Sequence, residues 1–376
     1  MYLNKLTNKS LYIYEKYRDN IFIRFILNIF SLFYFAIYKL RLILYKLNIL
    51  KSKSLNAIVI SIGNITTGGT GKTPIVIETA NYLLNKGYKV AVLSRGYKRK
   101  IINNNDALLV SDGNDIVADQ KTSGDEPFLI AKKAPKAIVI VGKDRIKTGL
   151  SAIKLGADVL ILDDGYQHIK LNRNENLLLL DGTKPFDNGR LLPGGKLREL
   201  PDSIKRASAI IISNSDKSTE DEIKKHTINK PTIFMKYKIR KLTGINIKKT
   251  INIEEMKGQK VIAFCGIANP GSFLKSLEEN NITVTSHLTF PDHHDYTVSD
   301  IEEIIKLAQN NKIENIITTE KDGIKVEELS ETVPMTLWNT VLEIQWETTE
   351  PFEKMFRNET ISKTNPKHYQ ATQHQF

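Results

Sequence analysis

The sequence contains few of the residues that build disulfide scaffolds or zinc sites. Cys265 is the only cysteine among 376 residues, which excludes an intramolecular disulfide and fits a reducing compartment. Seven histidines and one cysteine leave little room for a dense zinc site. No internal repeat occurs at the spacing of solenoid proteins. With 41% hydrophobic and 26% charged residues, the chain is expected to fold around a sizeable core, in about two domains.

Positive charge is concentrated at the start of the chain. Residues 1–53 contain ten Lys or Arg and two acidic residues, so they carry eight of the twelve net positive charges. A strongly basic start to a less basic body suggests an anionic partner for this segment.

The same basic segment contains an apolar run. FILNIFSLFYFAIY (25–38) has no charged residue, and no small-residue cleavage site follows it. As a helix these residues cover about 21 Å, which is short of the roughly 30 Å hydrocarbon core of a bilayer. The run therefore favours a helix lying in the membrane interface. A buried core helix and a membrane-spanning helix are the alternatives.

Short apolar runs without polar alternation predict buried strands along the rest of the chain. Helical patterns separate these runs, which argues for a parallel sheet covered on both faces. One such helix spans about 74–86, and Gly87 follows it as a C-terminal glycine cap. The first set of predicted strands is 57–64, 89–93, 137–142, 158–165, 177–181 and 209–213.

The pattern changes near residues 236–250, where an alternating and basic stretch suggests a strand pair joining two lobes. A second α/β run follows, with a helix from about Gly271 and another after Ser299. Ser299 and Glu302 match the spacing of a capping box. The predicted strands of this run are 260–266, 282–290 and 315–319.

The strongest chemical motif is GNITTGGTGKTP (63–74), which follows a predicted strand and precedes a predicted helix. Its glycines let backbone N–H groups surround phosphate oxygens, while Lys72 reaches the β- and γ-phosphates and the Thr73 hydroxyl binds Mg²⁺. Thr66 stands where the strict pattern G-x-x-x-x-G-K-[ST] has glycine, so the motif is a variant. The predicted nucleotide-binding residues are Thr66, Thr67, Gly68, Gly69, Thr70, Gly71, Lys72 and Thr73.

DVLILDDG (158–165) predicts a second part of the same site. The apolar strand ends in Asp163, as in a Walker B strand whose aspartate helps to hold Mg²⁺. Asp164 points elsewhere if the strand continues, so Asp163 is the expected metal ligand. The alternative is an ordinary strand that ends in an Asp-Gly turn.

Two further motifs have more than one interpretation. In SGDEP (123–127), Asp125 either caps the following helix, the more ordinary use of such a residue, or accepts a proton from a hydroxyl group. PDHHDY (291–296) is a solvated polar loop, a metal site or a set of groups that tunes a carboxylate.

Two basic loops are candidates for anion contact. GRLLPGGKLREL (189–200) combines Arg190, Lys196 and Arg198 with a flexible Pro-Gly-Gly sequence, although an ordinary surface loop has the same composition. SRGYKRK (94–100) follows a predicted strand, at the sheet edge where α/β folds bind ligands.

Together these motifs resemble those of the tetraacyldisaccharide 4'-kinases, the lipid A 4'-kinase family. The motifs occur in the same order as in the family, from about residue 60 to 325. The chain departs from the family pattern at four positions. It has Tyr166 where the family has Phe, Asn174 where it has Asp, Gly194 where it has Ala and Lys196 where it has Pro. The resemblance rests on GNITTGGTGKTP, LSRGY, SGDEP, GKDR (142–145), DDGYQH (163–168), LLPGGKLRE, FPDHH and TEKD (319–322).

The resemblance implies an α/β fold with a P-loop nucleotide-binding parallel sheet lobe, a smaller C-terminal α/β lobe and an N-terminal membrane-associating helix. The implied reaction transfers the γ-phosphoryl group of ATP to the 4'-hydroxyl of tetraacyldisaccharide 1-phosphate, with ATP and Mg²⁺ as cofactors. The expected location is the cytoplasmic face of the inner membrane. The corresponding segments are a membrane-associating segment at 1–53, a P-loop kinase domain at 54–235, a C-terminal α/β domain at 236–346 and a polar tail at 347–376.

By the same resemblance, Asp125 is the catalytic base, assisted by His293 in preference to His294, and Lys72 is catalytic. Thr73 and Asp163 are the metal-binding residues. The implied partners are the acylated disaccharide lipid and an anionic membrane surface, and neither nucleic acid nor a protein partner is expected. The implied substrate-binding residues are Arg145, Asp164, His168, Arg198 and Glu199.

Two other functions would use the same phosphate-binding loop. A P-loop kinase of a soluble substrate would not need the apolar, basic start. A membrane-associated, nucleotide-driven switch is disfavoured as a GTPase because the guanine-reading pattern N/T-K-x-D is absent. IISNSD (211–216) lacks the lysine, and Lys321 and Asp322 are adjacent in TEKD. An ATP-driven switch stays open.

Overall fold

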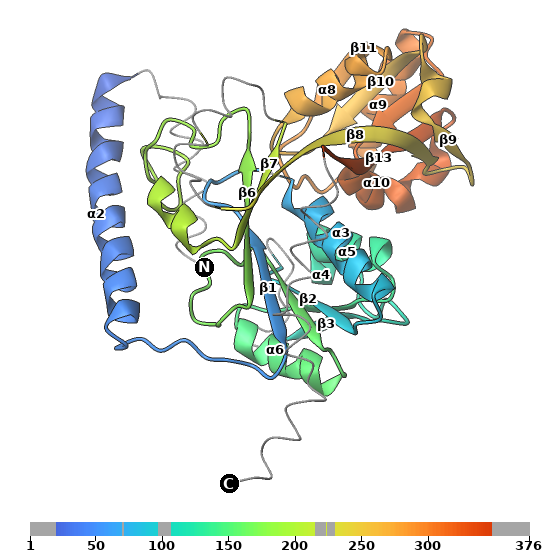
Figure 1. Ribbon diagram of the computed structural model, residues 1–376. Coiled ribbons are helices and arrows are strands. Elements are labelled where there is room, and N and C mark those ends of the chain that lie inside the picture. The colour runs from blue at the N-terminus through green and yellow to red at the C-terminus, as the bar shows by residue number, and fades with distance from the viewer. Residues whose placement is uncertain (1–19, 70, 97–106, 215–222, 224–229, 348–376) are drawn as a thin grey trace.

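One sheet of thirteen strands runs through the part of the chain that the computed structural model describes, residues 20–347 without Thr70, 97–106, 215–222 and 224–229 (Figure 1). Its strands are β1 (Ile58–Gly63), β2 (Val90–Ser94), β3 (Leu108–Asp112), β4 (Ile138–Val141), β5 (Val159–Asp163), β6 (Glu175–Asp181), β7 (Ala209–Ser213), β8 (Thr232–Gly244), β9 (Thr250–Asn252), β10 (Lys260–Cys265), β11 (Thr283–Thr289), β12 (Asn315–Thr318) and β13 (Thr336–Trp346). They are arranged in the order β11-β10-β12-β13-β8-β7-β6-β1-β5-β2-β4-β3, with β9 beside β8.

Helices cover both faces of this sheet, as the uninterrupted apolar strands require. The α-helices are α2 (Ile21–Lys46), α3 (Lys72–Asn85), α4 (Gln120–Ser123), α5 (Asp125–Lys133), α6 (Arg145–Lys154), α8 (Pro270–Glu279), α9 (Val298–Asn310) and α10 (Glu320–Val326). Short 3₁₀ helices are η1 (Pro201–Arg206), η2 (Ile253–Met256) and η3 (Glu327–Thr332). The prediction of an α/β fold with a mainly parallel sheet and an N-terminal apolar helix is confirmed.

Strand β1 shows why its sequence lacks polar alternation. Ile58, Ile60 and Ile62 join the core formed with α3 and α5, whereas Val59 joins the core on the opposite face with α6. All six residues of β1 are buried. The phosphate-binding loop therefore leaves a strand that is fixed from both sides.

The long strand β8 joins the two halves of the sheet, as Figure 1 shows. Its first residues, Thr232–Met235, pair in parallel with β7, and the rest pair antiparallel with β13 and β9. The predicted strand pair near 236–250 is thus β8 with β9. Because β13 also returns to the first core through Ile344 and Trp346, a domain boundary at residue 236 stays a prediction.

Two local predictions were wrong. The capping box of α9 is formed by Thr297 and Asp300, not by Ser299 and Glu302, so the helix begins at Val298. Helix α2 has 26 residues, about 39 Å in length, because charged residues beside the apolar run, including Arg24 and Lys39, continue the helix. The argument that this segment is too short to span a bilayer therefore fails.

Helix α2 lies along one side of the molecule (Figure 1). It begins at its N-cap Asn20, whose side chain accepts the N–H groups of Phe22 and Ile23. Among the described residues it is the one helix long and apolar enough to cross a membrane. Leu27 is its one buried residue, and Tyr34 and Phe35 pack against the core beside the 186–197 loop. Most of its apolar surface remains exposed.

Candidate active site

The phosphate-binding loop connects β1 to α3 at the carboxyl end of the sheet. Gly71 is the N-cap of α3 with φ +75°, and Gly68 has φ +111°. Both values lie in the left-handed region that favours glycine. The hydroxyl group of Tyr237, on β8, donates to the carbonyl oxygen of Gly71 at 2.6 Å. A Cβ atom on Gly71 would lie 2.6 Å from the Tyr237 ring, so this contact also requires glycine.

The first threonines of the loop are held by the 190–198 segment. Thr66 forms an antiparallel bridge with Leu197, and the N–H of Thr67 donates to the carbonyl oxygen of Lys196 at 2.7 Å. Thr73 lies in the first turn of α3. Gly69 approaches Ala268 from the other half of the sheet. Thr70, which was predicted with this group, lies outside the described residues.

Asp163 ends β5, next to β1, and is almost completely buried. Its Oδ2 accepts a hydrogen bond of 2.9 Å from Ser94 Oγ. Burial, and then the charges of Glu126 and Asp164, raise the pKa of Asp163. A buried carboxylate whose pKa is raised by neighbouring carboxylates is well suited to bind a cation.

Asp164 is bound by two cations. The backbone turns at this residue with φ +51°, and the side chain pairs with Lys72 Nζ at 3.4 Å and Arg198 Nη1 at 2.8 Å. Burial alone would raise its pKa, but Arg198 and Lys72 outweigh burial and hold the pKa of Asp164 well below its ordinary value. The structure thus brings together Lys72, Asp163, Asp164 and Arg198.

Arg145 and His168 lie nearby, and both are shielded from water. Arg145 donates to the backbone carbonyl oxygens of Gly142 and Asp163, and burial lowers its pKa to about 10. Burial and then the charge of Arg145 lower the pKa of His168 to about 4, so its ring is neutral at pH 7. Among the described residues, His168 Nε2 has no hydrogen-bond partner.

Glu199 has contacts of a different kind. Its carboxylate accepts from Arg206 Nη2 at 2.7 Å and from the hydroxyl group of Tyr38, in α2, at 3.2 Å. Only 2% of Glu199 is exposed. These contacts fix the loop against α2, and a part for Glu199 in substrate binding stays a prediction.

Asp125 and His293 meet across the two halves of the sheet. Asp125 Oδ2 lies 2.9 Å from His293 Nδ1, and both side chains are about nine-tenths buried. Gly124, not Asp125, is the N-cap of α5, and no side chain caps this helix. The capping interpretation of Asp125 is therefore wrong.

The Asp125 carboxylate is ionised in this setting. Burial would raise its pKa, but the hydrogen bond from His293 and the charge of Lys325 outweigh burial and hold the pKa well below its ordinary value. Lys325 Nζ lies 2.8 Å from Asp125 Oδ2.

The two neighbouring histidines differ in their contacts. His293 has a left-handed backbone, φ +63°, which directs its side chain to Asp125. His294 instead contacts Asp300 at 3.0 Å and stacks on Phe290. The described residues contain no group of three or more His, Cys, Asp or Glu placed to hold a metal ion. The PDHHDY loop is solvated only in part, because Pro291 and Asp295 are exposed whereas the His293 side chain is about nine-tenths buried.

Three departures from the expected family pattern have structural partners. The Tyr166 hydroxyl group donates to the carbonyl oxygen of Ser203, and Asn174 Oδ1 accepts the N–H of Val59 at 2.8 Å. A Cβ atom on Gly194 would lie 2.7 Å from Ser31 Oγ of α2. A smaller residue at position 194 thus lets the loop approach the helix.

Sequence reasoning missed Tyr237, Gln120 and Lys325. Tyr237 was part of the alternating stretch, but nothing in that stretch points to Gly71. Gln120 Nε2 donates to Asp125 Oδ1 from five residues earlier in the chain. Lys325 follows Lys321 of TEKD by one helical turn, and this spacing was the available signal.

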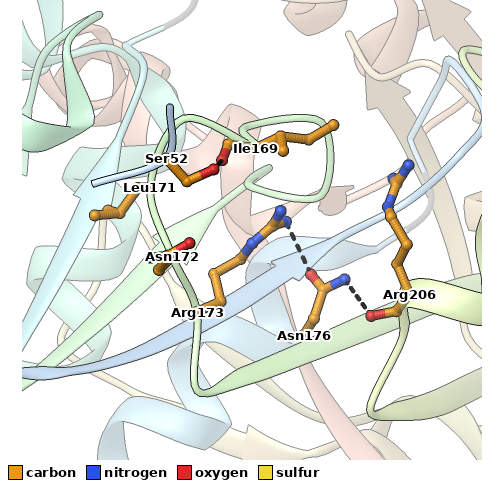
Figure 2. Close-up of a pocket in the computed structure, with 7 residues that line it drawn as sticks. All are labelled: Ser52, Ile169, Leu171, Asn172, Arg173, Asn176 and Arg206. Atoms are coloured by element: carbon orange, nitrogen blue, oxygen red, sulfur yellow. Dashed lines mark hydrogen bonds between the residues drawn. The ribbon is translucent and has the colours of Figure 1, made fainter. Parts of the chain in front are cut away.

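A polar cavity of about 250 Å³ lies apart from these residues, between the segment after α2 and the β5–β6 loop (Figure 2). Within it Arg173 Nη1 donates to Asn176 Oδ1, and Asn176 Nδ2 donates to the carbonyl oxygen of Arg206. Arg206 also binds Glu199. None of the predicted site residues lines this cavity. Arg206 braces the loop that contacts α2, whereas Arg173 donates to the carbonyl oxygens of Gly165 and Tyr166.

A glycine-rich loop between a buried strand and a helix, with a lysine and two aspartates at the sheet edge, defines the class of P-loop nucleotide-binding proteins. The carboxylate–histidine pair beside it is typical of a phosphotransferase that activates a hydroxyl group.

Comparison with known proteins gives the family. The family model described as tetraacyldisaccharide-1-P 4'-kinase matches residues 23–360. The tetraacyldisaccharide 4'-kinase of Pelobacter propionicus is 39% identical over 298 residues, which are 79% of this chain and 81% of the relative. That of Halothermothrix orenii is 38% identical over 318 residues, 80% and 82% of the two chains. The chain belongs to the tetraacyldisaccharide-1-P 4'-kinase family.

A solved structure agrees with this assignment. The crystal structure of LpxK from Aquifex aeolicus in complex with ATP is 34% identical, with a TM-score of 0.72. The match covers 91% of this chain and 99% of that chain. The similarity therefore includes both halves of the sheet.

Proposed function

We propose that this protein transfers the γ-phosphoryl group of ATP to the 4'-hydroxyl of tetraacyldisaccharide 1-phosphate. The observation that carries the proposal is the 2.9 Å contact between Asp125 and His293, which places a carboxylate–histidine pair where the two halves of the sheet meet. Family membership supplies the identity of the substrate. No contact among the described residues favours a soluble acceptor or a nucleotide-driven switch instead.

The phosphate-binding loop would hold the nucleotide. Backbone N–H groups of Gly68, Gly69 and Gly71, with the start of α3, would bind phosphate oxygens. Lys72 would stabilise charge on the transferring group. Asp164, which pairs with Lys72, holds the lysine side chain beside the loop.

Mg²⁺ would be bound by the Thr73 hydroxyl group and the Asp163 carboxylate. The residues fit the ion because Asp163 is buried at the end of β5 with Ser94 as its hydrogen-bond donor and with other carboxylates nearby. When bound, the ion offsets negative charge between the β- and γ-phosphates.

Asp125 would take the proton of the 4'-hydroxyl as the sugar oxygen forms its bond to the γ-phosphorus. The bond from that phosphorus to the bridging oxygen breaks, and ADP leaves with the bonding electrons. His293 would hold the carboxylate in place through its Nδ1–H. A low pKa makes Asp125 a weak base in solution, so close placement must supply most of the effect, with proton transfer late in the reaction.

The acylated disaccharide would be bound between Asp125 and α2. The proposed binding residues lie at or near the 163–168 turn and at the end of the 190–199 loop. In that loop, Arg198 and Glu199 also contact Tyr34 and Tyr38 of α2. The proposed binding residues are Arg145, Asp164, His168, Arg198 and Glu199.

Helix α2 would attach the enzyme to the cytoplasmic face of the inner membrane, where ATP is available. Its exposed face carries large apolar side chains such as Phe22, Phe25 and Phe33, and its flanks are basic. One face of α2 binds the 190–199 loop through polar groups of Ser31, Tyr34 and Tyr38. Because those contacts hold a polar loop against the helix, we favour a helix in the interface over one that spans the bilayer.

The test is a phosphoryl-transfer assay with ATP, Mg²⁺ and tetraacyldisaccharide 1-phosphate in mixed micelles. The expected product carries a new 4'-phosphate and forms with one ADP per lipid. An Asp125→Asn protein of unchanged fold is the matched control and should form it far more slowly. ATP hydrolysis without lipid phosphorylation in the parent protein would refute the proposal.

A further inference from the structure

Lys325 is a buried lysine whose ammonium group binds the proposed catalytic base. Its Nζ lies 2.8 Å from Asp125 Oδ2 and donates to the carbonyl oxygen of His294 at 3.1 Å. Only 3% of its side chain is exposed. Removing a lysine ammonium from water is costly unless a carboxylate compensates, so this contact is a strongly coupled pair and not an ordinary surface ion pair.

The groups around Asp125 all support an ionised carboxylate. Gln120 Nε2 donates to Oδ1, while His293 Nδ1 and Lys325 Nζ contact Oδ2. Lys321 Nζ lies 3.2 Å from His293 Nε2. Asp292 Oδ2 lies 3.8 Å from the same Nε2. Because an ammonium only donates, a proton on Nδ1 is the tautomer that fits the contacts of His293 with both Lys321 and Asp125. Further out, Lys321 pairs with Glu126 at 3.8 Å and Asp292 at 3.6 Å.

We propose that Lys325 is a positioning residue for phosphoryl transfer. Its ammonium group fixes Asp125 of α5 against α10, so that the carboxylate and His293 meet only when the two halves of the sheet are together. The inference rests on the proposed function, in which Asp125 takes the hydroxyl proton. His293 and Lys325 both donate to Oδ2 of Asp125. Oδ1 is therefore the oxygen that can still accept a further proton donor, such as the substrate hydroxyl group.

A purely structural role is the alternative, because α5 and the α10–η3 segment share other ion pairs. Lys132 of α5 lies 2.6 Å from Glu327 and Lys133 pairs with Glu320. Lys132 is 35% exposed and does not contact Asp125. Lys132→Met is therefore the matched control: it removes one positive charge and one ion pair from the same interface.

The experiment compares the full-length parent, Lys325→Met, Lys325→Arg and Lys132→Met. Lys325→Met should lower kcat at least about tenfold while KM for ATP stays within about twofold. With MgATP saturating, so that Asp163 stays ionised, the acid limb of its kcat profile should move to higher pH by about one unit, because loss of the cation raises the pKa of Asp125. Lys325→Arg keeps the charge and should keep the parental acid limb. Lys132→Met should match the parent in every respect.

A second measurement needs no lipid. A carboxylate with a depressed pKa contributes stability that is present above its ordinary pKa and is lost as the pH falls through the lower, folded-state value. The melting temperature of the parent should fall on acidification below about pH 4. The fall should be smaller in Lys325→Met. If this difference appears but the parent does not phosphorylate the lipid, the contact stands and the proposed function fails.

Three results would overturn the inference. They are a parental kcat and acid limb in folded Lys325→Met, an equal loss of kcat in Lys132→Met, or an acid limb in Lys325→Arg that shifts although the charge is kept. The arginine variant decides the matter if Lys325→Met does not fold.

Discussion

Tyr34 of the apolar helix α2 donates a hydrogen bond of 2.8 Å to the carbonyl oxygen of Arg198, and the guanidinium group of Arg198 binds Asp164. Asp164 in turn pairs with Lys72 of the phosphate-binding loop. A chain of direct contacts therefore connects the proposed membrane-binding helix to the proposed nucleotide site. On the proposed function, α2 would position part of the site as well as attach the enzyme to the membrane.

Replacing Tyr34 should weaken that connection. Tyr34→Phe removes one partly buried hydrogen bond, worth about 1 kcal/mol, and leaves the ring in its packing. We expect KM for the lipid to rise about threefold with little change in KM for ATP. Tyr45→Phe is the control, because Tyr45 lies on the same helix, where the Arg41 guanidinium group lies over its ring. Equal effects of the two substitutions on lipid KM would disprove a specific link through Arg198.

Lys72 should be needed for turnover and not for folding. Lys72→Ala removes a positive charge aimed at the transferring phosphoryl group, and kcat should fall by about 10²–10³-fold. Circular dichroism and melting temperature would show that the fold persists. Lys86→Ala, at the other end of α3, should turn over like the parent. A folded Lys72→Ala protein with parental kcat would show that the loop assignment is wrong.

The buried charge of Asp163 should lower the stability of the protein while it supports Mg²⁺-dependent activity. Ser94 donates a hydrogen bond to the Asp163 carboxylate, while burial, and then the charges of Glu126 and Asp164, raise its pKa. Asp163→Asn should raise the unfolding free energy of the metal-free protein by roughly 1–3 kcal/mol. The same change should greatly weaken the dependence of kcat on Mg²⁺. Thermal melts without metal and a Mg²⁺ titration of activity measure the two effects; a lower melting temperature would contradict the first.

The strands and the phosphate-binding loop were predictable because their signals are local. Four or more consecutive apolar residues, as in β4 or β7, have no other stable place than a covered sheet. The glycine spacing before Lys72 specifies a loop whose backbone approaches phosphate closely. Such features need no knowledge of distant residues.

The remaining features depend on distant partners. Strand β13 was not predicted, because its pairing with β8 joins residues about a hundred positions apart. Lys325 reads as an ordinary surface lysine until α10 is placed against α5. The capping box of α9 was placed two residues late because Ser299 and Thr297 both offer a hydroxyl group at plausible spacing. Only the backbone geometry distinguishes the two.

Membrane binding should depend on the exposed side chains of α2. Phe22 and Phe33 are 71% and 64% exposed, and each can contribute about 1.5–3 kcal/mol when buried in lipid. Phe22→Gln with Phe33→Gln should release the protein from anionic vesicles in a sedimentation assay, and high salt should weaken binding by the parent. Val298→Gln is the control, since Val298 is 61% exposed on α9. Parent protein that never sediments with anionic vesicles would count against the interfacial helix.

Asp125 and His293 should behave as one unit in catalysis. Asp125→Asn keeps the shape of the side chain but cannot take a proton, so kcat should fall by about 10²–10⁴-fold with modest change in either KM. His293→Ala should also lower kcat, because the carboxylate loses one of the two donors on Oδ2. If the two act together, the double variant should be much faster than the product of the two single losses predicts.

The control for this cycle is His294→Ala. His294 contacts Asp300 and Phe290 and has no contact with Asp125, so its loss should affect melting temperature more than kcat. Independent losses in Asp125→Asn and His293→Ala, which multiply in the double variant, would show that the 2.9 Å contact is not used in the reaction. In that case Asp125 would act as the base without help from His293. A near-parental kcat in Asp125→Asn would instead remove the base from this site altogether, because the structure gives its carboxylate no part in capping α5.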